Sequence, residues 1–206
     1  FFCRYERETQ VAMPGYYSVK LADMNIDVEL TVTERTAMHK YTFNQPGEAN
    51  LLLDLQNGLV FNSKNIRYRV LEGEVEMLDN KTIAGYNRVR GWVARYFYYM
   101  IVFDRPYTVK KELPQEEGEK AKRFILEFDL KEGESVQVKV ALSTVGIEGA
   151  KMALDKENPG WNFESIKAET NGKWNDMLSL VEVEGTEEEK MNFYTSMYQD
   201  GRSEER

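Results

Sequence analysis

The residues best suited to chemistry lie in one short run of the sequence, residues 85–92. In this run Trp92 follows Gly91, and Arg88 and Arg90 precede it. An indole ring offers a flat apolar face to the C–H groups of a sugar, and guanidinium groups hydrogen-bond to its hydroxyls. The run therefore predicts Trp92 and Arg88 as substrate-binding residues at the start of a strand. The alternative is that Trp92 closes the end of a β-sandwich core, and from the residues alone this alternative stands slightly ahead.

The chain has a single histidine, His39, and a single cysteine, Cys3. These counts exclude an internal disulfide, a histidine-rich metal site and a cysteine-built metal site. A catalytic Ser-His or Cys-His pair would depend on this one imidazole. Because His39 lies on the apolar face of an alternating strand, the sequence favours a partly buried, hydrogen-bonded histidine. Cys3 lies near one end of the chain and is expected to be inert.

The acidic residues mark no catalytic pair. Glu72, Glu74 and Glu76 alternate along one predicted strand face. An exposed acidic face is expected rather than a cation site, because calcium loops combine Gly with Asp or Asn at tight spacing. Glycoside hydrolysis needs two carboxylates at a defined separation, and nothing in the sequence marks them. Phosphate-cradling patterns such as GxGxxG are absent. We therefore predict no catalytic residue and no metal ligand in this chain.

Charge and composition limit the class of protein. The 206 residues include 27 Lys and Arg against 35 Asp and Glu, which gives a net charge of -8. This balance argues against nucleic-acid binding through bulk charge. The longest apolar stretches, such as residues 96–103, are far shorter than the ~20 residues that span a bilayer, so we expect no membrane span. The chain starts with Phe1 rather than Met, which predicts that an upstream part has been removed.

Hydrophobic residues recur with a period of two from residue 16 to about residue 145, which predicts strands. Residues 26–32 and 37–43 form one predicted hairpin around Glu34 and Arg35. Residues 123–130 and 135–142, joined by a turn at residues 131–134, form the clearest predicted hairpin. The apolar runs 51–53 and 96–102 predict strands covered on both faces. The acidic segment 110–122 is predicted to be a solvated loop.

The period changes to that of a helix after Val145. Apolar residues in steps of three and four predict one helix from about residue 163 to residue 181, and the capping box Thr186–Glu189 predicts the start of another. The fold class predicted is mainly β, an antiparallel two-sheet sandwich followed by short helices. We assign residues 1–145 to the sandwich domain and residues 146–206 to a helical linker segment.

Several separate strings of residues point to a known family. In chain order they are PGYYSV (14–19), ELT (29–31), HKYTF (39–43), LDL (53–55), IAGY (83–86), GW (91–92), ALSTV (141–145), IEGA (147–150) and FYTSMY (193–198). Together they resemble the N-terminal domain of glycoside hydrolase family 92, the calcium-dependent exo-acting α-mannosidases. Because the strings occur in the family's order over nearly the whole chain, the resemblance is specific.

The resemblance implies a supersandwich of the galactose-mutarotase-like kind, with linker helices leading to an (α/α)-barrel catalytic domain of the same polypeptide. It implies that the catalytic acid, the water-activating carboxylates and the calcium ligands belong mainly to that barrel. We therefore expect this chain alone to be inactive on α-mannosides and to hold no cofactor, with calcium and a mannose-containing glycan implied for the full-length enzyme. The resemblance also implies a periplasmic or extracellular location.

Two functions follow from these expectations. The chain is either a non-catalytic domain that supports the barrel and lines the sugar pocket, or a free-standing module that binds glycans or proteins. The sequence on either side of the chain would distinguish them.

Overall fold

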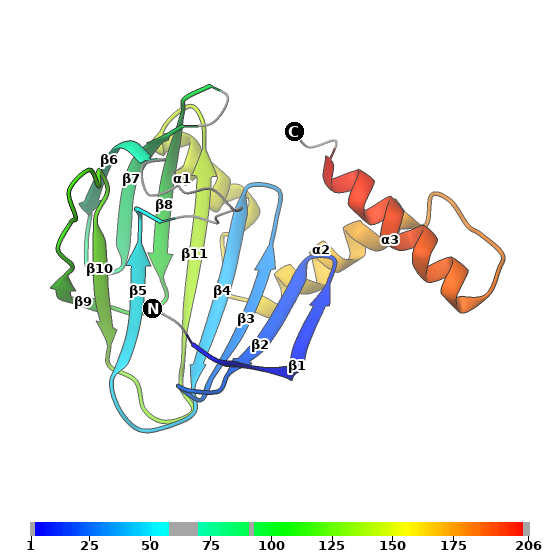
Figure 1. Ribbon diagram of the computed structural model, residues 1–206, viewed down its shortest axis with the longest axis horizontal. Helices are drawn as coiled ribbons and strands as arrows, with labels where there is room; N and C mark the ends of the chain where they lie inside the picture. The colour runs from blue at the N-terminus through cyan, green and yellow to red at the C-terminus, as the bar shows by residue number, and fades with distance from the viewer. Residues whose placement is uncertain (1–2, 58–69, 91–92, 204–206) are drawn as a thin grey trace.

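Two antiparallel sheets and three helices make up the chain in the computed structural model, which describes residues 3–57, 70–90 and 93–203 (Figure 1). Within these residues the larger sheet has eight strands in the order β1-β2-β3-β4-β11-β8-β7-β6, and the smaller has three in the order β5-β10-β9. The predicted fold class is therefore confirmed.

The strands are β1 (Tyr5–Met13), β2 (Tyr16–Leu21), β3 (Ile26–Val32), β4 (Thr36–Phe43), β5 (Ala49–Asp54), β6 (Val70–Met77), β7 (Thr82–Val89), β8 (Arg95–Phe103), β9 (Tyr107–Glu112), β10 (Arg123–Phe128) and β11 (Ser135–Ser143). The helices are α1 (Ile147–Glu157), α2 (Phe163–Leu178) and α3 (Glu187–Ser203). In the described part of the chain no helix precedes Ile147, as the change of period predicted.

The main core lies between the inner faces of the two sheets. Alternate residues of each strand point into it, because successive side chains of a strand project to opposite faces. Ile83 and Val136 of the larger sheet are 0 % exposed, and Leu126 of the smaller sheet is 1 % exposed. Burial of these side chains stabilises the sandwich in proportion to the apolar area removed from water.

One predicted hairpin is confirmed and the other is wrong. Strands β3 and β4 pair antiparallel around the turn at Glu34 and Arg35. By contrast, β10 pairs with β5 and β9, whereas β11 lies between β4 and β8 in the other sheet. Residues 131–134 therefore cross from one sheet to the other. Alternation in both strands arises because they face each other across the core, and alternation specifies a face but not a hydrogen-bonded neighbour.

The two apolar runs, residues 51–53 and 96–102, differ in how far their side chains are buried. Leu52 of β5 is 41 % exposed, so the prediction that residues 51–53 are covered on both faces is wrong. In β8 the prediction holds for the second half of the run, because Tyr99, Met100 and Ile101 are all buried. Tyr99 and Ile101 belong to the main core, and Met100 packs with residues of α1 on the outer face.

Helices α1 and α2 cover part of the outer face of the larger sheet. Ala150, Ala153 and Leu154 of α1 pack against Met100 and Ala141. Small residues on both sides let the helix backbone approach the strands closely. Helix α2 packs its buried residues Phe163 and Ile166 against Met38 of β4. The Asn162 side chain accepts a hydrogen bond from the Ser165 amide (3.1 Å) and caps its N-terminus.

A polar anchor fastens the end of α1 to the turn between β3 and β4. Glu157 accepts hydrogen bonds from the Thr33 hydroxyl (2.7 Å), the Arg35 amide (3.0 Å) and Arg35 Nε (2.6 Å). Although partial burial opposes it, this set of donors holds the pKa of Glu157 below its ordinary value. The three residues line a cleft of about 530 Å³ between the turn and the two helices.

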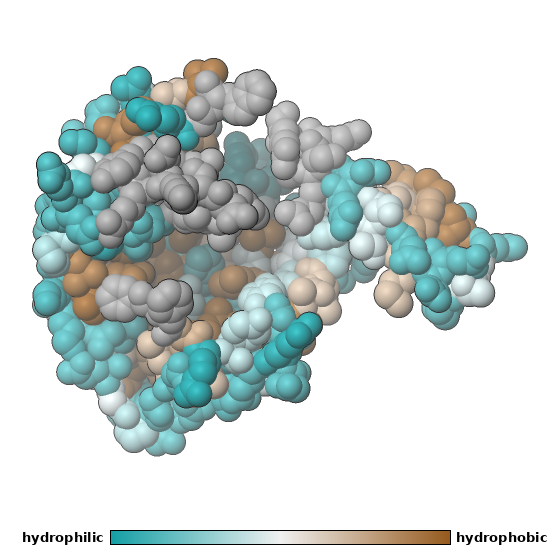
Figure 2. All heavy atoms as spheres, in the orientation of Figure 1, coloured by the Kyte–Doolittle hydropathy of each residue, from teal (hydrophilic) through white to brown (hydrophobic). Residues whose placement is uncertain are grey.

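Helices α2 and α3 form an arm beside the sandwich (Figure 1). Glu189 accepts from the Thr186 amide (2.8 Å), and the Glu189 amide donates to the Thr186 hydroxyl (3.3 Å), so the predicted capping box is confirmed. Trp174 and Tyr198 meet edge to face at 4.7 Å. Figure 2 shows hydrophobic side chains gathered on this arm. Its exposed large apolar residues are Leu180, Val181 and Met191.

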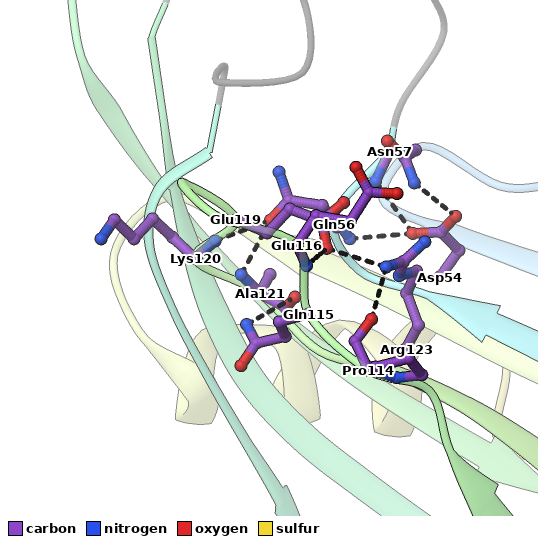
Figure 3. Close-up of polar contacts among 10 residues, drawn as sticks. All are labelled: Asp54, Gln56, Asn57, Pro114, Gln115, Glu116, Glu119, Lys120, Ala121 and Arg123. Atoms are coloured by element: carbon purple, nitrogen blue, oxygen red, sulfur yellow. Dashed lines mark hydrogen bonds and ion pairs between the residues drawn. The ribbon is translucent and has the colours of Figure 1, made fainter.

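The segment predicted to be a solvated loop over residues 110–122 is a mostly exposed loop from residue 113 onward, and hydrogen bonds hold it to the smaller sheet (Figure 3). Its first three residues belong to β9. The side chain of Gln56, which is 3 % exposed, accepts from the amides of Lys120 and Ala121 at 2.9 and 2.8 Å. Arg123 donates to the Pro114 carbonyl and to Glu119, each at 2.8 Å. The prediction is therefore confirmed for residues 113–122 and wrong for residues 110–112, which extend β9.

Candidate functional site

The described part of the predicted binding run lies along β7 and just beyond its end. Arg88 occupies the last part of β7 and is half-buried, and Arg90 is exposed just beyond this strand. Trp92 lies outside the described residues. The site is therefore built from Arg88 and from the residues that the pairing of β6, β7 and β8 brings beside it.

Strand register places Arg88 in a row with a carboxylate and an aromatic ring. Arg88 is paired with Glu72 of β6 on one side and with Tyr96 of β8 on the other. Two positions back along β7, Tyr86 is paired with Tyr98 of β8. Because these positions are even-numbered on paired strands, all five side chains share the outer face of the larger sheet. We call Glu72, Tyr86, Arg88, Tyr96 and Tyr98 the tyrosine cluster.

The three rings of the tyrosine cluster pack on one another. The Tyr86 ring centroid lies 5.6 Å from that of Tyr96 and 5.7 Å from that of Tyr98. The Tyr96 and Tyr98 rings are 6.1 Å apart with planes only 20° from parallel. The Arg88 guanidinium carbon lies 5.7 Å from the Tyr96 centroid, within the range of a cation–π contact. Tyr96 remains 39 % exposed, so the cluster presents aromatic surface to solvent.

Glu72 fixes the orientation of two of these rings. It accepts hydrogen bonds from the hydroxyls of Tyr86 (2.7 Å) and Tyr96 (3.5 Å). The hydrogen bond to Glu72 raises the pKa of Tyr86, so the phenol stays protonated and continues to donate. An ionised carboxylate accepts about four hydrogen bonds, so Glu72 has capacity for a ligand hydroxyl as well.

A glycine in β7 permits the local geometry. A Cβ on Gly85 would lie 2.1 Å from the Glu74 carbonyl oxygen and 2.5 Å from the Tyr99 hydroxyl. Tyr99 reaches across this position to donate to the Glu74 carbonyl at 2.9 Å. Any larger residue at position 85 would push β6 and Tyr99 apart. This contact fixes β6 against β8, and with it the spacing of Glu72 and Tyr96.

The tyrosine cluster suits recognition of a neutral, hydroxyl-bearing ligand. Exposed rings pack on C–H groups, Glu72 accepts from hydroxyls and the Arg88 fork donates to them. Sequence reasoning identified Arg88 but missed Glu72 and the three tyrosines. The available signal was the alternation of Tyr96 and Tyr98, which places two aromatic rings on one strand face. Tyr86 could not be joined to them without knowledge of the register.

The acidic side chains of β6 form an exposed face of the larger sheet. Glu74 and Glu76 are exposed beside Glu72, as the sequence predicted. Among the residues that the structure describes, no three Asp, Glu, His or Cys side chains converge on a point where a metal ion could bind.

His39 and Cys3 have structural surroundings. The Nδ1 atom of His39 lies 2.9 Å from the Tyr41 hydroxyl, and burial lowers the pKa of the imidazole. This confirms the partly buried, hydrogen-bonded histidine. The Cys3 thiol is partly exposed and contacts the neighbouring Arg4 carbonyl oxygen at 3.4 Å. Across the described residues, no helix has the length and apolar content needed to cross a membrane.

Two family models match the chain. The model described as the glycosyl hydrolase family 92 N-terminal domain matches residues 3–143, and the model of the family's catalytic domain matches residues 149–201. The first range covers the two sheets. The second covers most of α1 and all of α2, together with α3 as far as residue 201, so the helices assigned to a linker from the sequence resemble part of the catalytic-domain model.

Solved structures agree with the family match. A family GH92 alpha-mannosidase from Bacteroides thetaiotaomicron is 27% identical with a TM-score of 0.79, and the match covers 95% of this chain and 28% of that one. The same enzyme in complex with mannoimidazole gives 26% identity and a TM-score of 0.79, over 95% of this chain and 27% of that one. A family GH92 inverting mannosidase from Bacteroides thetaiotaomicron VPI-5482, at 21% identity and a TM-score of 0.79, shows the shared fold over 96% of this chain and 27% of that one. The chain thus spans little more than a quarter of these proteins. No curated protein sequence matches it.

Proposed function

Since the chain belongs to glycoside hydrolase family 92 through its N-terminal domain, we propose that it is the non-catalytic β-sandwich part of an α-mannosidase acting on mannose-containing glycans. It supports an (α/α)-barrel catalytic domain of the same polypeptide and lines the sugar pocket with Arg88 and Trp92. The proposal includes a periplasmic or extracellular location and calcium bound by the barrel.

The tyrosine cluster is the observation that carries this proposal. A sugar needs a flat apolar surface and several hydrogen-bonding groups at once. Arg88, Glu72 and the exposed ring of Tyr96 supply both within one patch on three neighbouring strands, and Trp92 follows Arg88 closely in the sequence. The mannoimidazole complex of the relative supports a mannose-like ligand for the family.

A binding measurement on the chain itself tests the sugar-recognition part. Methyl α-mannoside is titrated into the protein while saturation-transfer NMR reports the bound sugar. Affinity is expected to be weak, because few contacts must offset roughly 4 kcal/mol or more of lost rigid-body freedom. Arg88→Ala should weaken binding by a factor of about 10 to 150, since a hydrogen bond to a charged group contributes about 1.5–3 kcal/mol. The matched control is Arg7→Ala, which alters an exposed arginine of β1. Equal loss in both variants, or no binding by the unmodified chain, contradicts the assignment.

An activity assay tests the non-catalytic part. The chain should release no mannose from an α-mannobiose with calcium added, because the resemblance implies that the acid and base of hydrolysis belong mainly to the barrel. Mannose release that is proportional to chain concentration and abolished by a chelator would show that the chain is catalytic.

A further inference from the structure

A second cleft lies on the outer face of the larger sheet, between α1 and strands β6 to β8. Its volume is about 660 Å³, within the range of small-molecule binding sites. The floor is apolar and is formed by Ala84, Met100 and Val102. One wall carries Glu76 of β6. The other carries charged side chains of α1, namely Glu148, Lys151 and Asp155. We call this the α1 cleft.

One end of the α1 cleft is built from buried polar groups. Lys139, which is 5 % exposed, donates from Nζ to the Asn158 carbonyl at 2.7 Å and lies 4.3 Å from the centre of the Trp161 ring. Asn158 is 1 % exposed, and neither its Oδ1 nor its Nδ2 has a hydrogen-bond partner among the described residues. All three residues line the cleft. A buried amide without partners is costly, so this end is suited to a ligand that both donates and accepts hydrogen bonds.

The other end continues into the tyrosine cluster. Ala84 and Met100 of the cleft floor lie two positions from Tyr86 and Tyr98 on the same strands, and residues two apart share a face. From Thr82 to Arg88 the strand extends about 20 Å, at roughly 3.3 Å per residue. The cleft and the tyrosine cluster therefore form one elongated surface with aromatic residues at both ends.

We propose that this surface binds a carbohydrate chain, with one end of the oligosaccharide in the α1 cleft between Lys139, Asn158 and Trp161 and the other on the tyrosine cluster. The proposal goes beyond the proposed function because it assigns a site away from Trp92, and it rests on that function only for the class of ligand.

The charges on the cleft select a neutral ligand. Its walls carry carboxylates and ammonium groups together, and Lys151 is paired with Asp155 at 2.7 Å. Such a mixture disfavours a phosphate or another multiply charged anion. Sugar hydroxyls both donate and accept, so they can pair with the Asn158 amide, with Glu76 and with Lys139. Apolar floor residues match the C–H faces of the sugar rings.

Calorimetric titration of the chain with a linear α-mannotetraose tests the proposal. The tetraose should bind at least about tenfold more tightly than methyl α-mannoside, because it reaches both ends of the surface. Trp161→Leu should remove most of this advantage. Trp161 also packs beside the contact of α2 with β4, so its replacement could lower stability as well as affinity. Glu76→Ala changes an exposed residue instead, and it should weaken tetraose binding several-fold without changing the melting temperature. Glu8→Ala, on an exposed part of β1, is the matched control.

The outcomes separate the two proposals. Equal affinity for the two sugars, or unchanged tetraose binding in both Trp161→Leu and Glu76→Ala, overturns the carbohydrate assignment of the α1 cleft even if Arg88-dependent binding of methyl α-mannoside persists. A different result overturns the Arg88 site instead. In that result the unmodified chain does not bind methyl α-mannoside but does bind the tetraose, and Glu76→Ala weakens tetraose binding. If the tetraose does not bind and sedimentation shows a dimer that Glu76→Ala dissociates, the surface is a contact between copies and the inference is wrong.

Discussion

The inner and outer faces of the eight-stranded sheet differ in how they are covered. The inner face packs against the smaller sheet and contains fully buried side chains such as Ile83 and Val136. On the outer face, α1 and α2 cover only part of the strands, and the tyrosine cluster and the α1 cleft occupy the surface beside them. The difference indicates that the inner face provides most of the stability, whereas the outer face attaches the helices and carries the surfaces proposed for ligand binding.

Polar contacts also serve different purposes in the two regions. Beside the smaller sheet, the Gln56 side chain accepts hydrogen bonds from the backbone amides of Lys120 and Ala121 in the loop before β10 (Figure 3). On the outer face, Glu157 and Lys139 attach the end of α1 to the sheet at two places. The same outer face leaves the buried Asn158 amide without a hydrogen-bond partner among the described residues and the ring of Tyr96 exposed. Ligand contacts with the exposed ring of Tyr96 are therefore expected to be removable at little cost in stability.

The largest effect is expected from the inner face. Leu126→Ala should reduce the free energy of unfolding by about 2–5 kcal/mol, because it leaves a cavity in a closed core. Leu52→Ala, on the neighbouring strand β5 but 41 % exposed, should cost less than about 1 kcal/mol. Urea unfolding followed by circular dichroism measures both. Equal losses would mean that the smaller sheet does not close the core.

A smaller effect is expected where α1 is attached to the sheet. Glu157→Ala should cost about 1–2 kcal/mol, because it removes the hydrogen bonds from Thr33 and Arg35. Asp155→Ala, two residues earlier on the same helix, removes only an exposed pair with Lys151 and should change stability little. Thermal unfolding of the two variants compares them. If both variants match the unmodified chain, α1 is held by its apolar contacts alone.

Local patterns predicted the class of fold but not all of its connections. Period-two alternation identified most strands, and the change of period after Val145 identified α2 and α3 but gave no separate prediction of α1. It could not show that β10 and β11 belong to different sheets, because both strands bury one face in the same core. The pairing of a strand depends on contacts far away in the sequence, which a local pattern does not contain.

The candidate site was predictable only in part for the same reason. Arg88 was recognisable because a guanidinium near Gly and Trp is an unusual local combination. Glu72 and Tyr96 join it only through pairing of β6, β7 and β8. The hydrogen bond from Lys139 to the Asn158 carbonyl joins β11 to the end of α1, and neither local sequence predicts it.

The smallest expected effect concerns pH and His39, which lies on the inner side of β4 beside Tyr41. Burial lowers the pKa of this imidazole from its ordinary value of 6.5. Below pH 6.5 the unfolded chain therefore takes up a proton that the folded chain resists, so the free energy of unfolding falls as the pH decreases. The stability that depends on a neutral His39 is fully present above pH 6.5. It is lost as the pH falls toward the lower pKa of the folded state, and the free energy of unfolding then changes by at most about 1.4 kcal/mol per pH unit.

Because His39 is the only histidine, His39→Gln isolates this effect. Urea unfolding at pH 7.5 and pH 5.5 should show a larger decrease for the unmodified chain than for the variant. This range lies above the ordinary values of the Asp and Glu carboxyls, so their titration contributes little, and the terminal amino group contributes equally to both proteins. Parallel pH profiles would mean that the imidazole is hydrated in the folded state. The inner face would then be open to water beside His39, and the contrast between a closed inner face and an accessible outer face would not extend to this part of β4.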